Sequence, residues 1–145
     1  MDTRYSANPQ DLKRYTTEEL RKEFLIQNLY QADTVQAVYS HVDRMVTLGI
    51  MPVEKEISID EGMDVWHTFG VKYFLEVGFF NIGGEGHDGQ ITVDGTTYDM
   101  AFQDCIYITK GAKEVHFKSK DPQKPARFYG VSAPAHVSFE TKLLT

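Results

Sequence analysis

The chain has 145 residues, of which 41% are hydrophobic and 25% are charged, a composition typical of one folded domain and unlike that of a disordered chain. Its 21 acidic and 15 basic residues give a net charge of −6 without any long basic cluster, so nucleic acid is excluded as an expected partner. No apolar stretch reaches the roughly 20 residues of a membrane helix or resembles a signal peptide, so we expect a cytoplasmic protein without a membrane partner.

The first predicted element is a short helix that begins at Thr17. The Thr16 side chain can accept a hydrogen bond from the backbone N–H of Glu19, and the Glu19 side chain can reach back to the N–H of Thr16, which is the reciprocal pattern of a capping box. We predict that residues 1–34 form an N-terminal helical arm and that residues 35–145 form a β-rich domain.

From residue 35 onward, short β-type runs are separated by Gly, Pro and Asp. The clearest unit is a hairpin over residues 90–100, in which Asp94 and Gly95 can supply the two positive φ angles of a type I′ turn. The same pattern predicts strands over residues 36–42, 44–50, 105–109, 115–119 and 127–132. Many short strands with frequent turns indicate a mainly β fold, which we predict to be an antiparallel jelly-roll barrel with a short N-terminal helix.

Residues 76–83 resemble the end of the first cupin motif, in which a metal-binding glutamate is followed after six residues by glycine. A cupin metal site also needs a His-x-His pair before that glutamate, but the pair falls within residues 69–72, which contain no histidine. The third histidine position falls near Glu114, with His116 two residues beyond it. We therefore expect a cupin barrel without a metal of its own, and we keep Glu76, Glu114 and His116 as a degenerate alternative ligand set.

Cys105 is the only cysteine, which excludes an intrachain disulfide and a thiolate metal cluster. Its place in an apolar run predicts a buried, unreactive thiol. We predict that His67 and His87 are solvated loop or rim histidines. The glycine-rich stretch around His87 precedes a strand and does not open a helix, so it is no dinucleotide-binding loop.

Several longer segments are similar to one family beyond the general cupin pattern. They cover residues 4–9, 13–21, 39–44, 81–84, 110–115 and 132–136. Together they closely resemble the N-terminal half of 5-keto-4-deoxyuronate isomerase (4-deoxy-L-threo-5-hexosulose-uronate ketol-isomerase). This resemblance implies two fused cupin barrels that assemble into homo-oligomers, hexamers in the family. It also implies one zinc ion, held by three histidines and one glutamate of a second barrel that would lie beyond Thr145.

The resemblance further implies an aldose–ketose shift on a uronate from pectin or polyuronide breakdown, in which a base removes the proton beside the carbonyl and the cation stabilises the enediolate oxygen. Arg44 is the candidate for binding the substrate carboxylate, because arginine can grip it through two parallel hydrogen bonds. His41 and Asp43 are predicted on one strand face, a spacing that can fix the imidazole tautomer. Alternatively, His41 lies on a polar strand face or contacts the second barrel. His136 can face the second barrel or cap a turn, and we favour the contact with the second barrel.

Three interpretations stay open at this point. In the first, the chain is the scaffold half of a metal-dependent isomerase, and its partners are its own C-terminal barrel and a small uronate substrate. In the second, it is a stand-alone, non-catalytic cupin module that binds a sugar acid or assembles into oligomers. In the third, it is a minimal metal enzyme that uses Glu76, Glu114 and His116.

Overall fold

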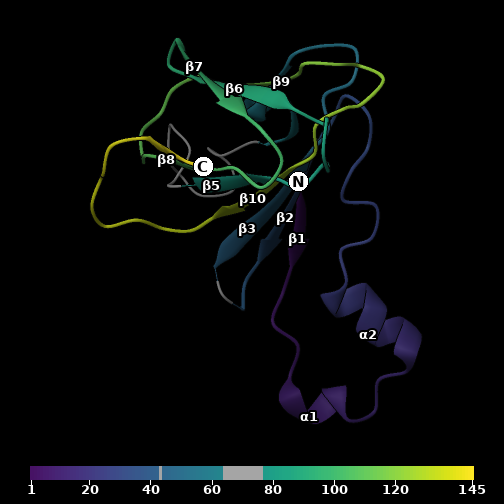
Figure 1. Cartoon of the computed structure of the whole chain (residues 1–145). Helices are drawn as coiled ribbons and strands as arrows, with labels where there is room; N and C mark the ends of the chain where they lie inside the picture. Colours follow the sequence, from purple (N-terminus) through teal and green to yellow (C-terminus); the bar gives the residue numbers. More distant parts are fainter. Residues whose placement is uncertain (43, 64–76) are drawn as a thin grey trace.

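The computed structural model describes residues 1–42, 44–63 and 77–145. These residues form two β-sheets and an N-terminal arm that extends away from the sheets and carries two short helices (Figure 1).

The helices of the arm are α1 (Pro9–Leu12) and α2 (Thr17–Phe24). Thr16 caps α2 as predicted: its hydroxyl accepts a hydrogen bond from the Glu19 N–H at 3.3 Å, and the Glu19 carboxylate accepts one from the Thr16 N–H at 2.7 Å. Neither helix contains a buried residue. The arm is therefore held by contacts at its ends and not by a core of its own.

The larger sheet has seven strands in the described part of the chain, in the order β1-β2-β3-β10-β5-β8-β11. Their bounds are β1 (Asp2–Arg4), β2 (Val35–Ser40), β3 (Met45–Ile50), β10 (Phe128–Ser132), β5 (Val77–Asn81), β8 (Cys105–Ile108) and β11 (Lys142–Leu144). Neighbouring strands pair antiparallel except β1 and β2, which pair parallel. The first strand of the chain thus lies at one edge of the sheet and the last at the other.

The smaller sheet has the strand order β4-β9-β6-β7. Its strands are β4 (Ile57–Ser58), β9 (Val115–Ser119), β6 (Gly89–Val93) and β7 (Thr96–Met100), and the 3-10 helix η1 (Ile59–Gly62) follows β4 directly. The predicted hairpin is confirmed, since β6 pairs with β7 across a two-residue turn with φ of +46° at Asp94 and +86° at Gly95.

The two sheets enclose one hydrophobic core to which both contribute aromatic rings. The Phe117 ring of the smaller sheet lies 4.8 Å from the Phe79 ring and 5.4 Å from the Phe128 ring of the larger one, measured between ring centroids. Gly130 lies opposite Phe79 on the neighbouring strand, where a Cβ atom would stand 2.3 Å from a carbon of the Phe79 ring. The absence of a side chain at residue 130 lets this ring reach the core.

The prediction of a mainly β, antiparallel jelly-roll fold with a short N-terminal helix is confirmed. Among the described strands the two sheets remain separate and do not pair into a closed barrel. The strand predicted over residues 36–42 ends at Ser40, so His41 lies in the turn after it and not on the strand. The predicted division between an arm of residues 1–34 and a barrel of residues 35–145 stays a prediction, although β1 from the arm pairs with β2.

Candidate functional site

His41 lies in the turn after β2, beside the edge strand β1 and between two aromatic rings. Its imidazole stacks on Tyr5, with centroids 4.7 Å apart and planes 12° apart, and meets Tyr39 edge-on at 4.8 Å. The parallel pairing of β1 with β2 creates this cluster, because it places Thr3 opposite Tyr39 and lets the His41 N–H donate to the Arg4 carbonyl oxygen at 2.9 Å. The rings hold the exposed imidazole in one orientation.

Arg44 lies in the same turn, between β2 and β3. Its side chain is exposed, and its backbone has a φ of +56°, in the left-handed region that is costly for residues other than glycine. Asp43, the predicted partner of His41, lies outside the described residues. His41 and Arg44 therefore flank one turn, at the end of the sheet from which the arm departs.

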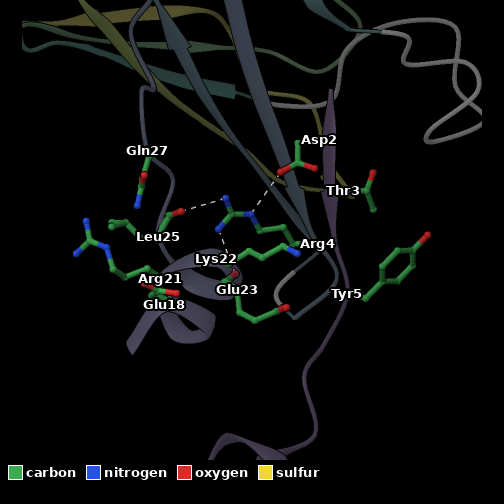
Figure 2. A pocket seen from close by; sticks show the side chains of 10 residues that line it. All are labelled: Asp2, Thr3, Arg4, Tyr5, Glu18, Arg21, Lys22, Glu23, Leu25 and Gln27. Carbon is green, nitrogen blue, oxygen red and sulfur yellow. Dashed lines mark hydrogen bonds and ion pairs between the residues drawn. The ribbon is translucent and has the colours of Figure 1, made fainter. Parts of the chain in front are cut away.

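Arg4 ties this end of the sheet to the arm. Its guanidinium donates hydrogen bonds to the carbonyl oxygens of Glu23 and Leu25, each at 3.1 Å, and lies 3.5 Å from the Asp2 carboxylate. A cation at the last carbonyl groups of a helix is favourable because it meets the negative end of the helix dipole. These contacts, drawn in Figure 2, lie in a cleft of about 680 Å³ that is lined by residues of β1, α2 and the segment directly after α2.

His136 lies apart from this cluster. It is exposed in the loop between β10 and β11, where Lys110 donates a hydrogen bond to the neighbouring Ala135 carbonyl oxygen at 3.2 Å. The described residues therefore bring His41 and Arg44 to one turn and leave His136 on a different loop.

Glu114 and His116 do not fit a zinc site inside the barrel. They alternate with the buried residues Val115 and Phe117, so they lie on the outer side of the smaller sheet. His116 Nδ1 lies 3.5 Å from a carboxylate oxygen of Glu56. Glu76 lies outside the described residues, and within the described ranges no group of three or more His, Cys, Asp or Glu side chains is arranged to hold a metal.

Cys105 and His87 are both half-buried, and neither lies near the cluster around His41. Cys105 is half-buried, and burial raises the pKa of its thiol. His87 is also half-buried and its Nδ1 lies 3.0 Å from the Pro125 carbonyl oxygen, whereas His67 lies outside the described residues. Neither described side chain has the surroundings of a catalytic nucleophile or base.

Comparison with known proteins gives one consistent name. No family model matches the chain. The 4-deoxy-L-threo-5-hexosulose-uronate ketol-isomerase of Lachnospira eligens is 46% identical over 144 residues, which cover 97% of this chain and 49% of that protein. The proteins of the same name from Pectobacterium carotovorum and from a strain of Escherichia coli are 44% and 46% identical, cover 100% of this chain, and are each matched over 51% of their length.

Over nearly its whole length the chain is similar to one half of the proteins named 4-deoxy-L-threo-5-hexosulose-uronate ketol-isomerase. It spans about half the length of the curated relatives that it matches. The solved structure of the Clostridium difficile EutQ protein is more distant, with 20% identity and a TM-score of 0.38 over 64% of this chain and 57% of that one. None of the helices in the described part of the chain has the length and apolar character needed to span a membrane.

The sequence did not indicate the aromatic surroundings of His41 or the role of Arg4. Tyr5 and His41 are 36 positions apart, and only the pairing of an edge strand brings them together. The one available signal was that residues 4–9 and 39–44 both belong to the segments that resemble the family.

Proposed function

We propose that the chain is the N-terminal scaffold half of a ketol-isomerase that converts 5-dehydro-4-deoxy-D-glucuronate into 3-deoxy-D-glycero-2,5-hexodiulosonate during the breakdown of pectin and related polyuronides in the cytoplasm. Support comes from 43–46% identity to proteins with the name of this activity, across 97–100% of the chain. The conversion needs no oxidant: one proton moves from the carbon beside the aldehyde to the aldehyde carbon, and one hydroxyl proton moves to the carbonyl oxygen.

The proposal gives this half the tasks of binding, orientation and assembly. Arg44, exposed at the β2–β3 turn, is proposed to bind the substrate carboxylate. His41 and His136 are proposed to contact the substrate or the second barrel. The zinc ion implied by the family resemblance is assigned to the second barrel, because the described donors of this chain do not fit it. Assembly into homo-oligomers also belongs to the proposal.

The test is to measure zinc by mass spectrometry, together with isomerase activity, on this chain alone and joined to the remaining half of the Lachnospira eligens relative. If zinc and turnover are found only when the two halves are joined, the scaffold role is supported. Uronate binding by the short chain, without turnover in either protein, favours the stand-alone module. Zinc and turnover in the short chain contradict the proposal and return attention to Glu76, Glu114 and His116.

Arg44→Gly gives a sharper test of the substrate contact. Glycine removes the guanidinium and also suits the left-handed backbone at this position, so folding stability should not fall. We expect the joined protein with Arg44→Gly to keep its melting temperature and to show a raised KM. An unchanged KM contradicts the role proposed for Arg44.

A further inference from the structure

Strand β1 forms one edge of the larger sheet, and among the described strands only β2 pairs with it. The Arg4 carbonyl oxygen accepts a hydrogen bond from the His41 N–H at 2.9 Å, so the backbone groups of Arg4 point toward β2. Successive residues of a strand direct their N–H and C=O groups to opposite sides of the strand. The N–H and C=O groups of Thr3 and the N–H of Tyr5 therefore point away from β2, toward the free side of β1.

The cleft of about 680 Å³ lies on this free side. Four consecutive residues, Asp2–Tyr5, line it, and Figure 2 shows Asp2 and Arg4 pointing toward α2 while Tyr5 points the other way. Of the described residues that line this cleft, none belongs to β2. Two smaller hollows beside Arg4, of about 170 and 260 Å³, both include Val38 of β2. The larger cleft therefore runs along the backbone edge of β1.

The opposite wall of the cleft is α2 and the segment after it, which the hydrogen bonds from Arg4 hold in place. Glu18, Arg21 and Lys22 line this wall, and none of the three has a side-chain hydrogen bond or ion pair among the described contacts. Counting Asp2, Arg4 and Glu23 as well, the described lining residues include three carboxylates and three cations. The cleft is therefore balanced in charge, although the chain carries a net charge of −6.

We propose that this cleft binds an extended, polar peptide segment of another protein, which adds to β1 as a further strand. A row of unpaired backbone groups at the edge of a sheet is the template for such addition. At roughly 3.3 Å per residue, Asp2–Tyr5 is about 13 Å long and can pair with about four residues of the segment. Side chains alternate along an added strand, so every second one faces the polar wall formed by Glu18, Arg21 and Lys22.

An extended segment suits the cleft better than a small polar ligand or a second copy of the chain. The unpaired groups repeat along the strand, and another backbone offers donors and acceptors with the same repeat. A second copy would bring a further charge of −6, which opposes its approach. The inference does not rest on the isomerase activity, because peptide binding is measured without substrate or zinc.

The first test uses a phage-displayed library of short random peptides, selected on the immobilised chain. We expect selected peptides, made synthetically, to bind the chain in solution by calorimetry. Methylation of single peptide N–H groups then tests the binding mode on the unaltered protein. It should weaken binding roughly 3- to 10-fold at every second position within about four residues, and little at the positions between. A library without enriched peptides overturns the proposal, and so does a methylation pattern without this alternation.

The second test removes the edge donor from the protein. Thr3→Pro deletes the N–H that points away from β2, where proline is tolerated in an edge strand, so the pairing of β1 with β2 should persist. Hydrogen exchange of the His41 N–H checks that pairing. We expect peptide binding to weaken roughly 10-fold or more in Thr3→Pro and to stay unchanged in the control Thr3→Ala. Equal binding by the two variants overturns the proposal.

Two other results of these tests are also decisive. If Thr3→Pro speeds exchange of the His41 N–H, the strand itself has loosened, and the methylation pattern on the unaltered chain decides. If the chain forms a dimer in sedimentation that Thr3→Pro abolishes, a second copy fills this edge, and the proposal of a peptide from another protein is overturned.

Discussion

The Arg4 guanidinium donates a hydrogen bond to the Glu23 carbonyl oxygen at 3.1 Å, which joins the edge strand β1 to the last turn of α2 across 19 positions of sequence. A second hydrogen bond, to Leu25, closes the same helix end. Since neither helix of the arm contains a buried residue, these bonds are a main restraint on the position of the arm among the described contacts.

Arg4→Ala should therefore release the arm without unfolding the sheets. We expect removal of the Arg4 guanidinium to lower the free energy needed for local opening of the arm by about 1–2 kcal/mol. Proteolysis within residues 13–25 should then become roughly 5- to 30-fold faster. Limited proteolysis followed by mass spectrometry measures this rate. Arg21→Ala is the matched control, because Arg21 lines the same cleft without a described side-chain hydrogen bond. Equal cleavage rates in the two variants contradict the restraint.

Asp33 holds the segment that follows β3. Its carboxylate accepts hydrogen bonds from the N–H groups of Val53, Glu54 and Lys55 at 2.7, 3.0 and 3.3 Å. The hydrogen bond from Val53 is the largest cause that lowers the pKa of Asp33 below its ordinary value, with smaller contributions from Lys55 and Glu54. A lowered pKa in the folded state means that the ionised carboxylate stabilises the fold.

Asp33→Asn should lower the free energy of unfolding by about 1 kcal/mol at neutral pH. This value is modest because the site is accessible to solvent. The stabilisation is fully present above the unfolded pKa of about 3.9 and is lost as the pH falls through the lower folded pKa, so wild type and variant should converge in acid. Urea denaturation at several pH values measures the difference. Asp60→Asn is the control, and a difference that persists undiminished in acid contradicts the assignment.

Gly130→Ala should destabilise the core. The added Cβ atom would lie 2.3 Å from the Phe79 ring and 3.1 Å from the Leu48 Cβ, so the ring must move, and we expect a loss of about 2 kcal/mol. Gly78 on the neighbouring strand is the matched control, because its closest atom would be 4.0 Å away. Thermal denaturation should show a clear fall in Tm for Gly130→Ala and little change for Gly78→Ala. Equal shifts would contradict the packing described for Phe79.

Cys105 should react slowly as a nucleophile. Burial raises the pKa of its thiol, so the reactive thiolate forms only at higher pH than in a free cysteine peptide. The rate of alkylation by iodoacetamide at low protein concentration should rise with a midpoint above that of a cysteine peptide measured in parallel. In denaturant the two midpoints should coincide. A folded midpoint at or below the peptide value would contradict this prediction.

The elements that the sequence predicted well are those whose signals are local. The capping box needs only Thr16 and Glu19, and the β6–β7 hairpin needs only Asp94, Gly95 and the alternation around them. Strand β9 was predicted with its observed bounds, Val115–Ser119, because buried and exposed residues alternate along it.

The elements that were missed depend on distant partners. Strand β1 has three residues and is recognisable only from its parallel pairing with β2, and β11 is an equally short edge strand. The same limit applies to the candidate site. His116 was considered together with its sequence neighbour Glu114, whereas its described contact is Glu56, from the segment before the neighbouring strand β4.

The parallel pairing of β1 with β2 makes the arm a closed loop and not a loose tail. Residues 5–34 leave the sheet after β1 and return to it at β2, on the adjacent strand, so both ends of the arm are fixed within one hydrogen-bonded ladder. A force applied to the helices is therefore shared between two strands, and the arm cannot be drawn out without first separating β1 from β2. A partner that binds this arm would therefore be attached to the larger sheet through two neighbouring strands.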